Sequence, residues 1–211
     1  MGSHGNYSPF IWVTDFSSLG TCDRPPSIRF ERVRPHQFLS TLEVLFFFCV
    51  ESLICYDDFQ EQYYLPLEET LAIAEQLGVP HPKSSKNIPW LMTTDAVITL
   101  NQDGQKVRYA RTIKLSKQLT ERNVAKFAIE REFWVKRYVD WGIVTERDIP
   151  EPFARNWAWL RNKYELPDIT QDVIRTVGEV LLGLIKGREA SLSSLTMQTD
   201  TRLGLELVEG H

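Results

Sequence analysis

The sequence predicts an α/β fold in which helices flank a mixed sheet, followed by a small all-helical domain. One observation is the stretch 90–119, where two β-branched, apolar runs flank a polar segment that ends in Gly104, as in a β-hairpin. A second is the order of periodic segments, which runs helix, strand, helix, hairpin, helix, strand. The third is a change at 147–168, where prolines surround an aromatic helix and only helical patterns follow. We therefore expect a domain boundary at about residue 148.

Composition limits the class of protein. The chain has 211 residues, 43% of them hydrophobic, which suffices for one packed domain with a small appendage. The longest apolar run, 44–50, is far shorter than a membrane span, and the N-terminus lacks the basic-then-apolar layout of a secretory signal. Three cysteines without ligand spacing predict reduced thiols. These features predict a cytoplasmic protein.

Residues 1–35 are predicted to form a basic N-terminal arm, because prolines and a glycine interrupt any long element. The arm's arginines, which either follow a phosphate backbone or are simply solvated, are Arg24, Arg29, Arg32 and Arg34. After Pro35, apolar residues at helical spacing predict a helix that runs to about Glu51. Glu43 is the only acid between Pro35 and Val50. It therefore lies either at the edge of the core or against a partner inside it.

The elements around the hairpin follow from periodicity and caps. The segment 56–65 predicts a strand, and 66–78 predicts a helix closed by its last residue, a glycine. His81 follows in a polar, proline-bounded loop, where a single histidine is more often structural than a ligand or a base. After the hairpin, the sequence predicts a helix over 121–139 and a short buried strand over 141–145.

Each strand of the hairpin carries one charge at a position that is expected to be buried. Asp95 and Lys114 have apolar or β-branched neighbours, and burying an unpaired ion costs several kcal/mol. The pattern Asp-x(n)-Z-x-Lys, with Thr112 at Z and Ile113 at x, is that of the PD-(D/E)xK nuclease superfamily. There the acid holds a divalent cation and the lysine adjoins the attacking water. The plain alternative is a cross-strand salt bridge.

Charge is spread unevenly along the chain, although the net charge is −4. Residues 51–76 contain seven acids and no lysine or arginine, whereas 105–137 contain ten lysines or arginines and three acids. The basic region begins on the strand that carries Lys114. A cationic surface beside a metal site suits a polyanionic substrate. The alternative is a solvated face of helix and loop.

The C-terminal part is predicted to be helical throughout. Beyond the aromatic helix, apolar periodicity predicts helices over 169–186 and 192–203. Short helices in this number resemble a helix-turn-helix or winged-helix core, but no convincing wing follows. We therefore expect residues 149–211 to form a small, winged-helix-like domain.

Seven segments resemble the TnsA endonucleases of heteromeric transposition systems, including those carried with CRISPR effectors. These segments are 39–43, 61–63, 69–74, 92–95, 110–114, 129–134 and 141–146, together with Gly78 and His81-Pro82. They occur in order between residues 10 and 150. The resemblance implies a restriction-endonuclease-like catalytic domain at 36–148. It also implies that the enzyme nicks the 5′, non-transferred strand at each transposon end, while a DDE transposase cleaves and joins the other strand.

The resemblance places the catalytic residues at Glu43, Asp95 and Lys114, which are also the anomalous charges of the sequence. Thr112 replaces the acid or glutamine common at that position, so its side chain is not expected to bind metal. Glu130 is a candidate acidic neighbour of the site. The implied cofactor is Mg²⁺, with Mn²⁺ as a substitute, because carboxylates and carbonyls are the ligands that these ions prefer.

In the implied mechanism, Asp95, Glu43 and the carbonyl of Ile113 bind the metal. Lys114 orients or deprotonates the attacking water and neutralises the phosphate. Basic residues expected to contact the DNA backbone are Arg111, Lys117, Arg122 and Lys126. Such contacts position DNA without reading its sequence.

The implied partners are transposon-end DNA, a TnsB-like DDE transposase and a TnsC-like AAA+ regulator bound through the C-terminal domain. No membrane is involved, and the protein would act in the bacterial cytoplasm at the nucleoid. One alternative is a catalytically inert scaffold of the same fold that bridges the regulator and the transposase, against which the presence of all three charged residues argues. Another is a stand-alone restriction or repair nuclease, but no target-recognition domain is evident.

Overall fold

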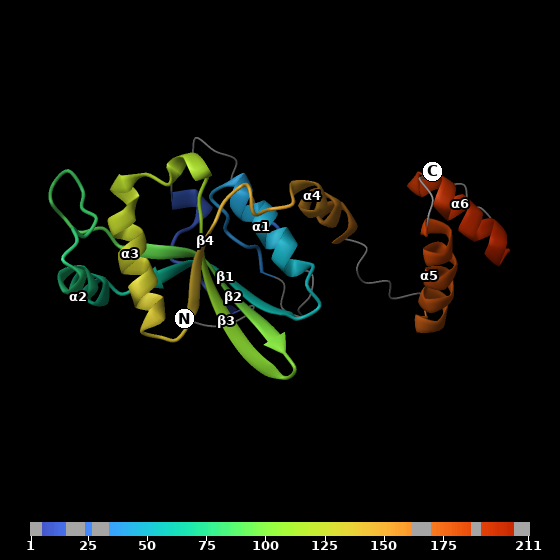
Figure 1. Cartoon of the computed structure of the whole chain (residues 1–211), viewed down its shortest axis with the longest axis horizontal. Helices are drawn as coiled ribbons and strands as arrows, with labels where there is room; N and C mark the ends of the chain where they lie inside the picture. The colour runs from blue at the N-terminus through green and yellow to red at the C-terminus, as the bar shows by residue number, and fades with distance from the viewer. Residues whose placement is uncertain (1–5, 16–23, 27–33, 162–169, 187–190, 205–211) are drawn as a thin grey trace. The chain divides into compact units, whose positions relative to one another are not determined.

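The computed structural model describes residues 6–15, 24–26, 34–161, 170–186 and 191–204 (Figure 1). The chain divides into two compact units, residues 1–162 and 163–211. Each unit is described by itself below.

The first unit is built on a four-stranded mixed sheet. The strands β1 (Tyr56–Leu65), β2 (Met92–Gln102), β3 (Gln105–Ile113) and β4 (Asp140–Val144) lie in the order β1-β2-β3-β4. Strand β2 is antiparallel to both β1 and β3, and β4 runs parallel to β3. Four helices pack on this sheet, namely α1 (Thr41–Glu51), α2 (Leu67–Leu77), α3 (Glu121–Val135) and α4 (Glu151–Leu160). The predicted mixed sheet with flanking helices is confirmed.

The two faces of the sheet have separate cores. Residues of α1 and α4 pack with Phe59, Ala96 and Ile98 on one face. Residues of α2 and α3 pack with Val97 and Ala110 on the other face. Because successive strand residues point to opposite faces, Ala96 and Ile98 belong to one core and Val97 belongs to the other. This double burial explains why the strand reads as a continuous apolar run.

The predicted hairpin joins β2 and β3 through Asp103 and Gly104. Both residues have positive φ, 52° and 84°, which suits a two-residue turn that matches the twist of the strands. The side chain of Asn101 accepts a hydrogen bond from the N–H of Gly104 at 3.0 Å. The turn therefore sets the register that brings β2 and β3 together.

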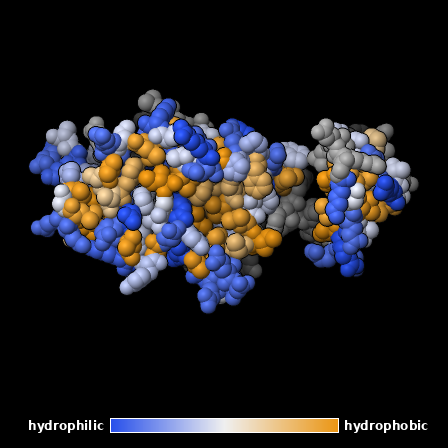
Figure 2. Space-filling view, viewed as in Figure 1, coloured by the Kyte–Doolittle hydropathy of each residue, from blue (hydrophilic) through white to orange (hydrophobic). Residues whose placement is uncertain are grey.

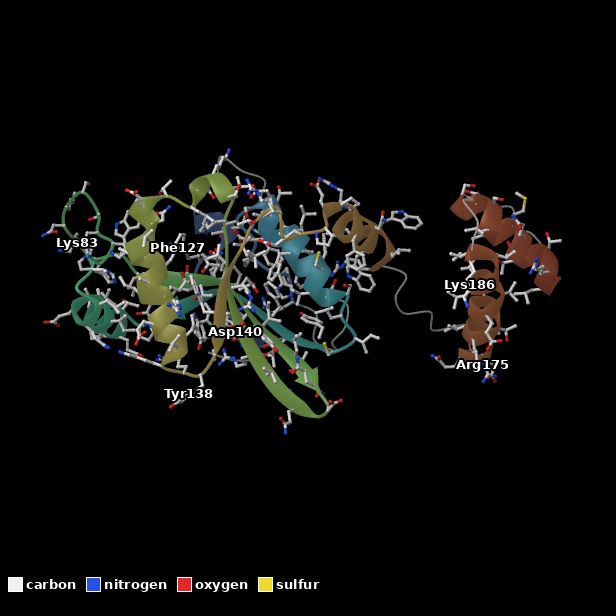
Figure 3. All side chains as sticks on the ribbon, viewed as in Figure 1. Lys83, Phe127, Tyr138, Asp140, Arg175 and Lys186 are labelled. Atoms are coloured by element: carbon white, nitrogen blue, oxygen red, sulfur yellow. The ribbon has the colours of Figure 1, made fainter. Side chains whose placement is uncertain are left out.

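Two helix boundaries differ from the prediction. Helix α1 begins after Ser40 rather than after Pro35, because Ser40 has an extended backbone, with a φ of −150° and a ψ of 153°, and caps the helix by accepting from the N–H of Glu43. Helix α3 ends at Val135 rather than at 139. There a turn leads to Tyr138, which has a φ of 56° and is 99% exposed (Figure 3).

Part of the predicted basic arm is internal. Arg34 is buried and pairs with Glu61 at 2.6 Å, and His36 reaches the same carboxylate at 2.9 Å. Burial alone would raise the pKa of Glu61, but these hydrogen bonds outweigh it and lower that pKa to about 2. Arg34 therefore does not contact a phosphate backbone as the sequence allowed. Arg29 and Arg32 lie outside the described residues.

Helix α4 contacts α1 through a buried ion pair between Arg161 and Glu51 at 2.7 Å. The domain boundary predicted at 148 falls before α4, and it stays a prediction. In the second unit, α5 (Gln171–Ile185) and α6 (Leu192–Leu203) pack on each other. The predicted C-terminal helical segment is thus confirmed. No helix in the described part of the chain is long and apolar enough to span a membrane.

Candidate active site

Glu43 is fixed by the start of its own helix. The side chain of Ser40 accepts a hydrogen bond from the N–H of Glu43 at 3.3 Å, and the Ser40 hydroxyl donates to Oε1 of Glu43 at 2.9 Å. The N–H of Leu39 donates to Oε2 at 3.0 Å. The two hydrogen bonds between Ser40 and Glu43 resemble a capping box, in which the Glu43 carboxylate also accepts from the N–H of Leu39, the residue before the cap. This arrangement holds a carboxylate that is only 5% exposed in one orientation.

Asp95 and Lys114 meet at the end of the hairpin opposite its turn. Oδ2 of Asp95 accepts hydrogen bonds from Nζ of Lys114 at 2.8 Å and from the N–H of Ile113 at 2.7 Å. The ladder between β2 and β3 stops at the pair Ala96 and Arg111, one position before Asp95. The carboxylate of Asp95 therefore accepts the hydrogen bond from the N–H of Ile113 at the point where the backbone ladder ends. The cross-strand salt bridge of the sequence analysis exists.

A cleft of about 560 Å³ lies between the start of α1 and the end of β3. Its lining includes Glu43 from α1 together with Ile113 and Lys114 from β3 and the residue after it. The fold therefore brings together Glu43, Asp95 and Lys114, which are 71 positions apart at most in sequence.

The charges of these groups are interdependent. Burial, and then the negative charge of Asp95, raise the pKa of Glu43 to about 7. Burial would lower the pKa of Lys114, but the charges of Asp95 and Glu43 and the hydrogen bond to Asp95 raise it on balance. Lys114 is therefore a cation at neutral pH, whereas Glu43 ionises only as the pH rises through about 7.

Glu130 of α3 is a further carboxyl group beside the site. It is fully buried, and Thr112 donates its hydroxyl to Oε1 of Glu130 at 2.6 Å. The other oxygen, Oε2, accepts no hydrogen bond of ordinary length among the described residues. Burial, followed by the charge of Asp95, raises the pKa of Glu130. Thr112 thus positions an acid that the sequence analysis named only as a candidate neighbour.

Gln62 of β1 is the contact that sequence reasoning missed. It is 2% exposed, and its Nε2 donates to Oε2 of Glu43 at 3.3 Å. Its Oε1 accepts a hydrogen bond from Thr93 at 3.3 Å. A φ of 49° in the middle of a strand is uncommon for this residue type, and the ladder with β2 skips the pair of Gln62 and Asp95. No sequence pattern marks such a residue, because its role depends on one unusual backbone conformation.

The other predicted residues lie in different surroundings. Arg111 pairs with Asp140 at 2.6 Å at the start of β4, and Figure 3 labels Asp140 there. Lys117 is exposed, and Lys126 is half-buried on α3, whereas the side chain of Arg122 lies outside the described residues. His81 is buried with hydrogen-bond partners at both ring nitrogens, Thr70 and the carbonyl of Pro82, each at 3.0 Å. This environment fits a structural histidine.

The donor chemistry of the site fits a hard divalent cation. Glu43 and Asp95 supply carboxylate oxygens, and Glu130 is a third carboxyl group close enough for the charge of Asp95 to raise its pKa. In the described part of the chain, no group of three or more histidine, cysteine, aspartate or glutamate side chains is placed to hold a metal. The remaining ligands of a bound ion would therefore be backbone carbonyls, waters and phosphate oxygens.

Comparison with known families covers both parts of the chain. The model described as the TnsA-like endonuclease N terminal matches residues 56–146, and the model described as the TnsA endonuclease C terminal matches residues 148–210. The chain belongs to the TnsA endonuclease family. A relative is the Transposon Tn7 transposition protein TnsA of Escherichia coli, 27% identical over 206 residues. That alignment covers 97% of this chain and 74% of the relative.

The TnsA-like N-terminal match includes Asp95, Ile113, Lys114 and Glu130, and begins after Glu43. The match to the family's C-terminal model begins two residues after the N-terminal match ends. Both halves of a TnsA endonuclease are therefore present in the order of the family. The resemblance found in the sequence is confirmed at the level of the family.

Proposed function

We propose that this TnsA-family chain is a Mg²⁺-dependent DNA endonuclease that nicks the 5′, non-transferred strand at transposon ends. The observation that supports this most is the meeting of Glu43, Asp95 and Lys114 at one end of the sheet, inside a family of endonucleases. Three different elements contribute these side chains. Residues at the start of α1 hold Glu43, and hydrogen bonds across the hairpin hold Asp95 against Ile113 and Lys114.

Each residue has a distinct role in the proposed reaction. Asp95 and Glu43 would hold the cation through their carboxylates, with the Ile113 carbonyl as a further ligand. A Mg²⁺ ion bound there supplies charge compensation for the phosphate as negative charge develops on it. Lys114, whose pKa is raised, keeps its proton at neutral pH. It would therefore orient the attacking water and neutralise the phosphate.

The proposed partners are transposon-end DNA, a DDE transposase and an AAA+ regulator. Support comes from the E. coli relative, which is described as a transposition protein. We assign the regulator to residues 149–211, where helices α5 and α6 carry hydrophobic residues that reach the surface (Figure 2). Those that are at least 40% exposed are Val173, Ile174, Leu182, Ile185 and Met197. Such a surface on two short helices suits a protein partner.

A second candidate is an inert scaffold of the same fold. One observation favours it: the oxygens of Glu43 already accept hydrogen bonds from Leu39, Ser40 and Gln62, and Asp95 already pairs with Lys114. Both carboxylates are thus satisfied by the protein itself. Carboxylate oxygens have two lone pairs each, so these bonds leave room for a cation.

Cleavage of a transposon-end duplex by the reconstituted complex separates the two candidates. Lys114→Ala is expected to lower the rate of Mg²⁺-dependent nicking by a factor of about 10² or more, because it removes the cation that faces the phosphate. The matched control is Lys106→Ala at the other end of β3, where the lysine pairs with Asp57 and is 58% exposed. Nicking that is equal in both variants would favour the scaffold.

A further inference from the structure

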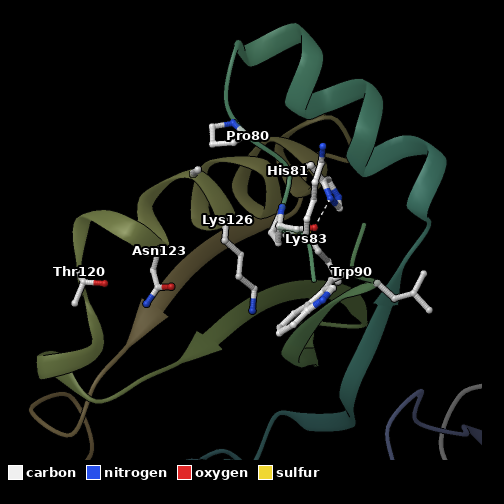
Figure 4. Close-up of a pocket in the computed structure, with 11 residues that line it drawn as sticks. Pro80, His81, Lys83, Trp90, Thr120, Asn123 and Lys126 are labelled. Carbon is white, nitrogen blue, oxygen red and sulfur yellow. Dashed lines mark hydrogen bonds between the residues drawn. The ribbon is translucent and has the colours of Figure 1, made fainter. Parts of the chain in front are cut away.

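A second cavity, of about 550 Å³, lies between the loop 80–91 and the first turns of α3 (Figure 4). Its lining combines an exposed tryptophan with two lysines and an amide. The polar and aromatic members are His81, Lys83, Trp90, Thr120, Asn123 and Lys126. None of the described residues that line it is acidic. The cavity is therefore cationic and has an aromatic wall.

The wall is a fixed part of the fold. Loop 80–91 folds back on itself, with hydrogen bonds from the N–H of Ser84 to the carbonyl of Ile88 and from the N–H of Trp90 to the carbonyl of Pro82, each 2.9 Å long. Buried His81 anchors the base of this loop to Thr70 of α2. Trp90 is nevertheless 58% exposed. The exposed ring lines the cavity together with charged and polar side chains, so it is available to a ligand there.

Two lysines bring positive charge to the ring from different elements. Lys83 belongs to the loop, and Lys126 belongs to α3. In Figure 4, the side chain of Lys126 extends toward Trp90. An aromatic ring in a cavity lined by two lysines matches a nucleotide, which offers a base with a π face and a phosphate.

The cavity adjoins the candidate active site along two elements. Met92, which lines the cavity, precedes Asp95 by three residues on β2, a span of about 10 Å. Lys126 lies one helical turn before Glu130 on α3. A strand of DNA whose scissile phosphate is at Asp95 would therefore place a nearby nucleotide within reach of Trp90.

We propose that this cavity binds one nucleotide of the substrate DNA next to the cleaved bond, with its base against Trp90 and its phosphate between Lys83 and Lys126. The inference rests on the proposed nuclease function, because it takes transposon-end DNA as the ligand. It adds a binding site that holds the strand in register with Asp95.

The test measures binding of the full chain to a transposon-end duplex in Ca²⁺ buffer, without cleavage. Trp90→Ala is expected to weaken binding about tenfold, because one stacked base is lost. The matched control is Ile88→Ala, which removes a 60% exposed residue of the same loop that does not line the cavity. Duplexes with a single abasic sugar at successive positions near the cleavage point complete a thermodynamic cycle. At one position, base removal should weaken binding of the wild type about tenfold and leave the affinity of Trp90→Ala unchanged.

The lysines have a different signature. Lys83→Ala and Lys126→Ala should each reduce the slope of log affinity against log salt concentration by about one, whereas Trp90→Ala should leave that slope unchanged. Lys86→Ala, on the same loop but outside the cavity lining, is the control for general charge loss.

Several results would overturn the proposal. One is binding of every duplex by Trp90→Ala as tight as that of the wild type. Another is a loss of affinity in Trp90→Ala that adds to the loss from an abasic sugar at every position. If Trp90→Ala kept DNA binding but failed to assemble with the transposase, the cavity would be a protein contact. Failure of the nuclease function itself shows separately, as cleavage that survives Asp95→Ala, because the binding assay requires no cleavage.

Discussion

Gln62 connects the two carboxylates of the site at the level of single residues. Its side chain donates to Glu43, while its strained backbone interrupts the ladder opposite Asp95. A non-glycine residue at positive φ costs about 1–3 kcal/mol, and such strain concentrates at functional sites. Gln62 is therefore expected to position Glu43 and not to touch the substrate.

Replacing Gln62 separates its two contributions. Gln62→Gly is expected to relieve the backbone strain and to keep the melting temperature close to that of the wild type, yet to raise the Mg²⁺ concentration that half-maximal nicking requires. Gln62→Glu would add a third negative charge beside Glu43 and lower stability. The measurements are thermal unfolding and a Mg²⁺ titration of nicking. An unchanged Mg²⁺ requirement in Gln62→Gly would leave Gln62 a purely structural residue.

The charge of Glu43 is expected to destabilise the folded protein and to be required for nicking. Its folded-state pKa is raised to about 7 from an ordinary value of 4.5, so the folded protein binds more protons than the unfolded chain between these values. The free energy of unfolding therefore falls as pH rises through this window, by about 3 kcal/mol at most. Glu43→Gln removes the charge. We expect it to raise the melting temperature at pH 8, to change it little at pH 4, and to abolish nicking. A melting temperature that does not rise at pH 8 would contradict this balance.

At the level of elements, a buried ion pair joins α1 to α4. Arg161 makes two hydrogen bonds to the carboxylate of Glu51, at 2.7 and 2.8 Å, and Trp157 donates to the same group at 3.1 Å. Glu51 is completely buried. This contact ties α4 to the helix that carries Glu43.

Removing one partner of this pair should destabilise the first unit strongly. Arg161→Ala leaves a buried carboxylate without its cation, which costs about 3–5 kcal/mol. The control on the same helix is Arg155→Ala, which breaks an exposed pair with Glu151 worth about 0–1 kcal/mol. Denaturant unfolding of both variants measures the difference. Equal losses would mean that α4 is not held through Glu51.

Sequence reasoning located elements whose pattern is local and missed those set by distant contacts. The hairpin follows from β-branched runs and from Asp103-Gly104, which are local signals. The segment before α1 makes a distant contact, from Gln37 to Glu61, 24 positions away, which periodicity does not reveal, so the start of the helix was placed too early. Asp95 and Lys114 could be found because a charge inside an apolar run stands out, whereas Gln62 has no such contrast.

At the scale of the whole molecule, the family matches identify the kind of protein, and the fold groups three charged side chains. The two family matches cover residues 56–146 and 148–210 and indicate the kind of protein. The structure shows that α1, β2 and the end of β3 bring Glu43, Asp95 and Lys114 to one site. The roles of these residues in cleavage, and the strand that is cut, are proposals that only the assembled system can test.

Strand-resolved cleavage by the reconstituted transposition complex in Mg²⁺ tests the central claim most directly. Each strand of a transposon-end duplex carries its own label, and wild type is compared with Asp95→Ala. The hairpin-turn variant Asp103→Asn serves as a control for loss of an aspartate from the same hairpin, because asparagine also tolerates its positive φ. We predict that Asp95→Ala loses the nick on the 5′ strand and keeps cleavage and joining of the other strand. Cutting of both strands at the wild-type rate would contradict the assignment of the chemistry to Asp95.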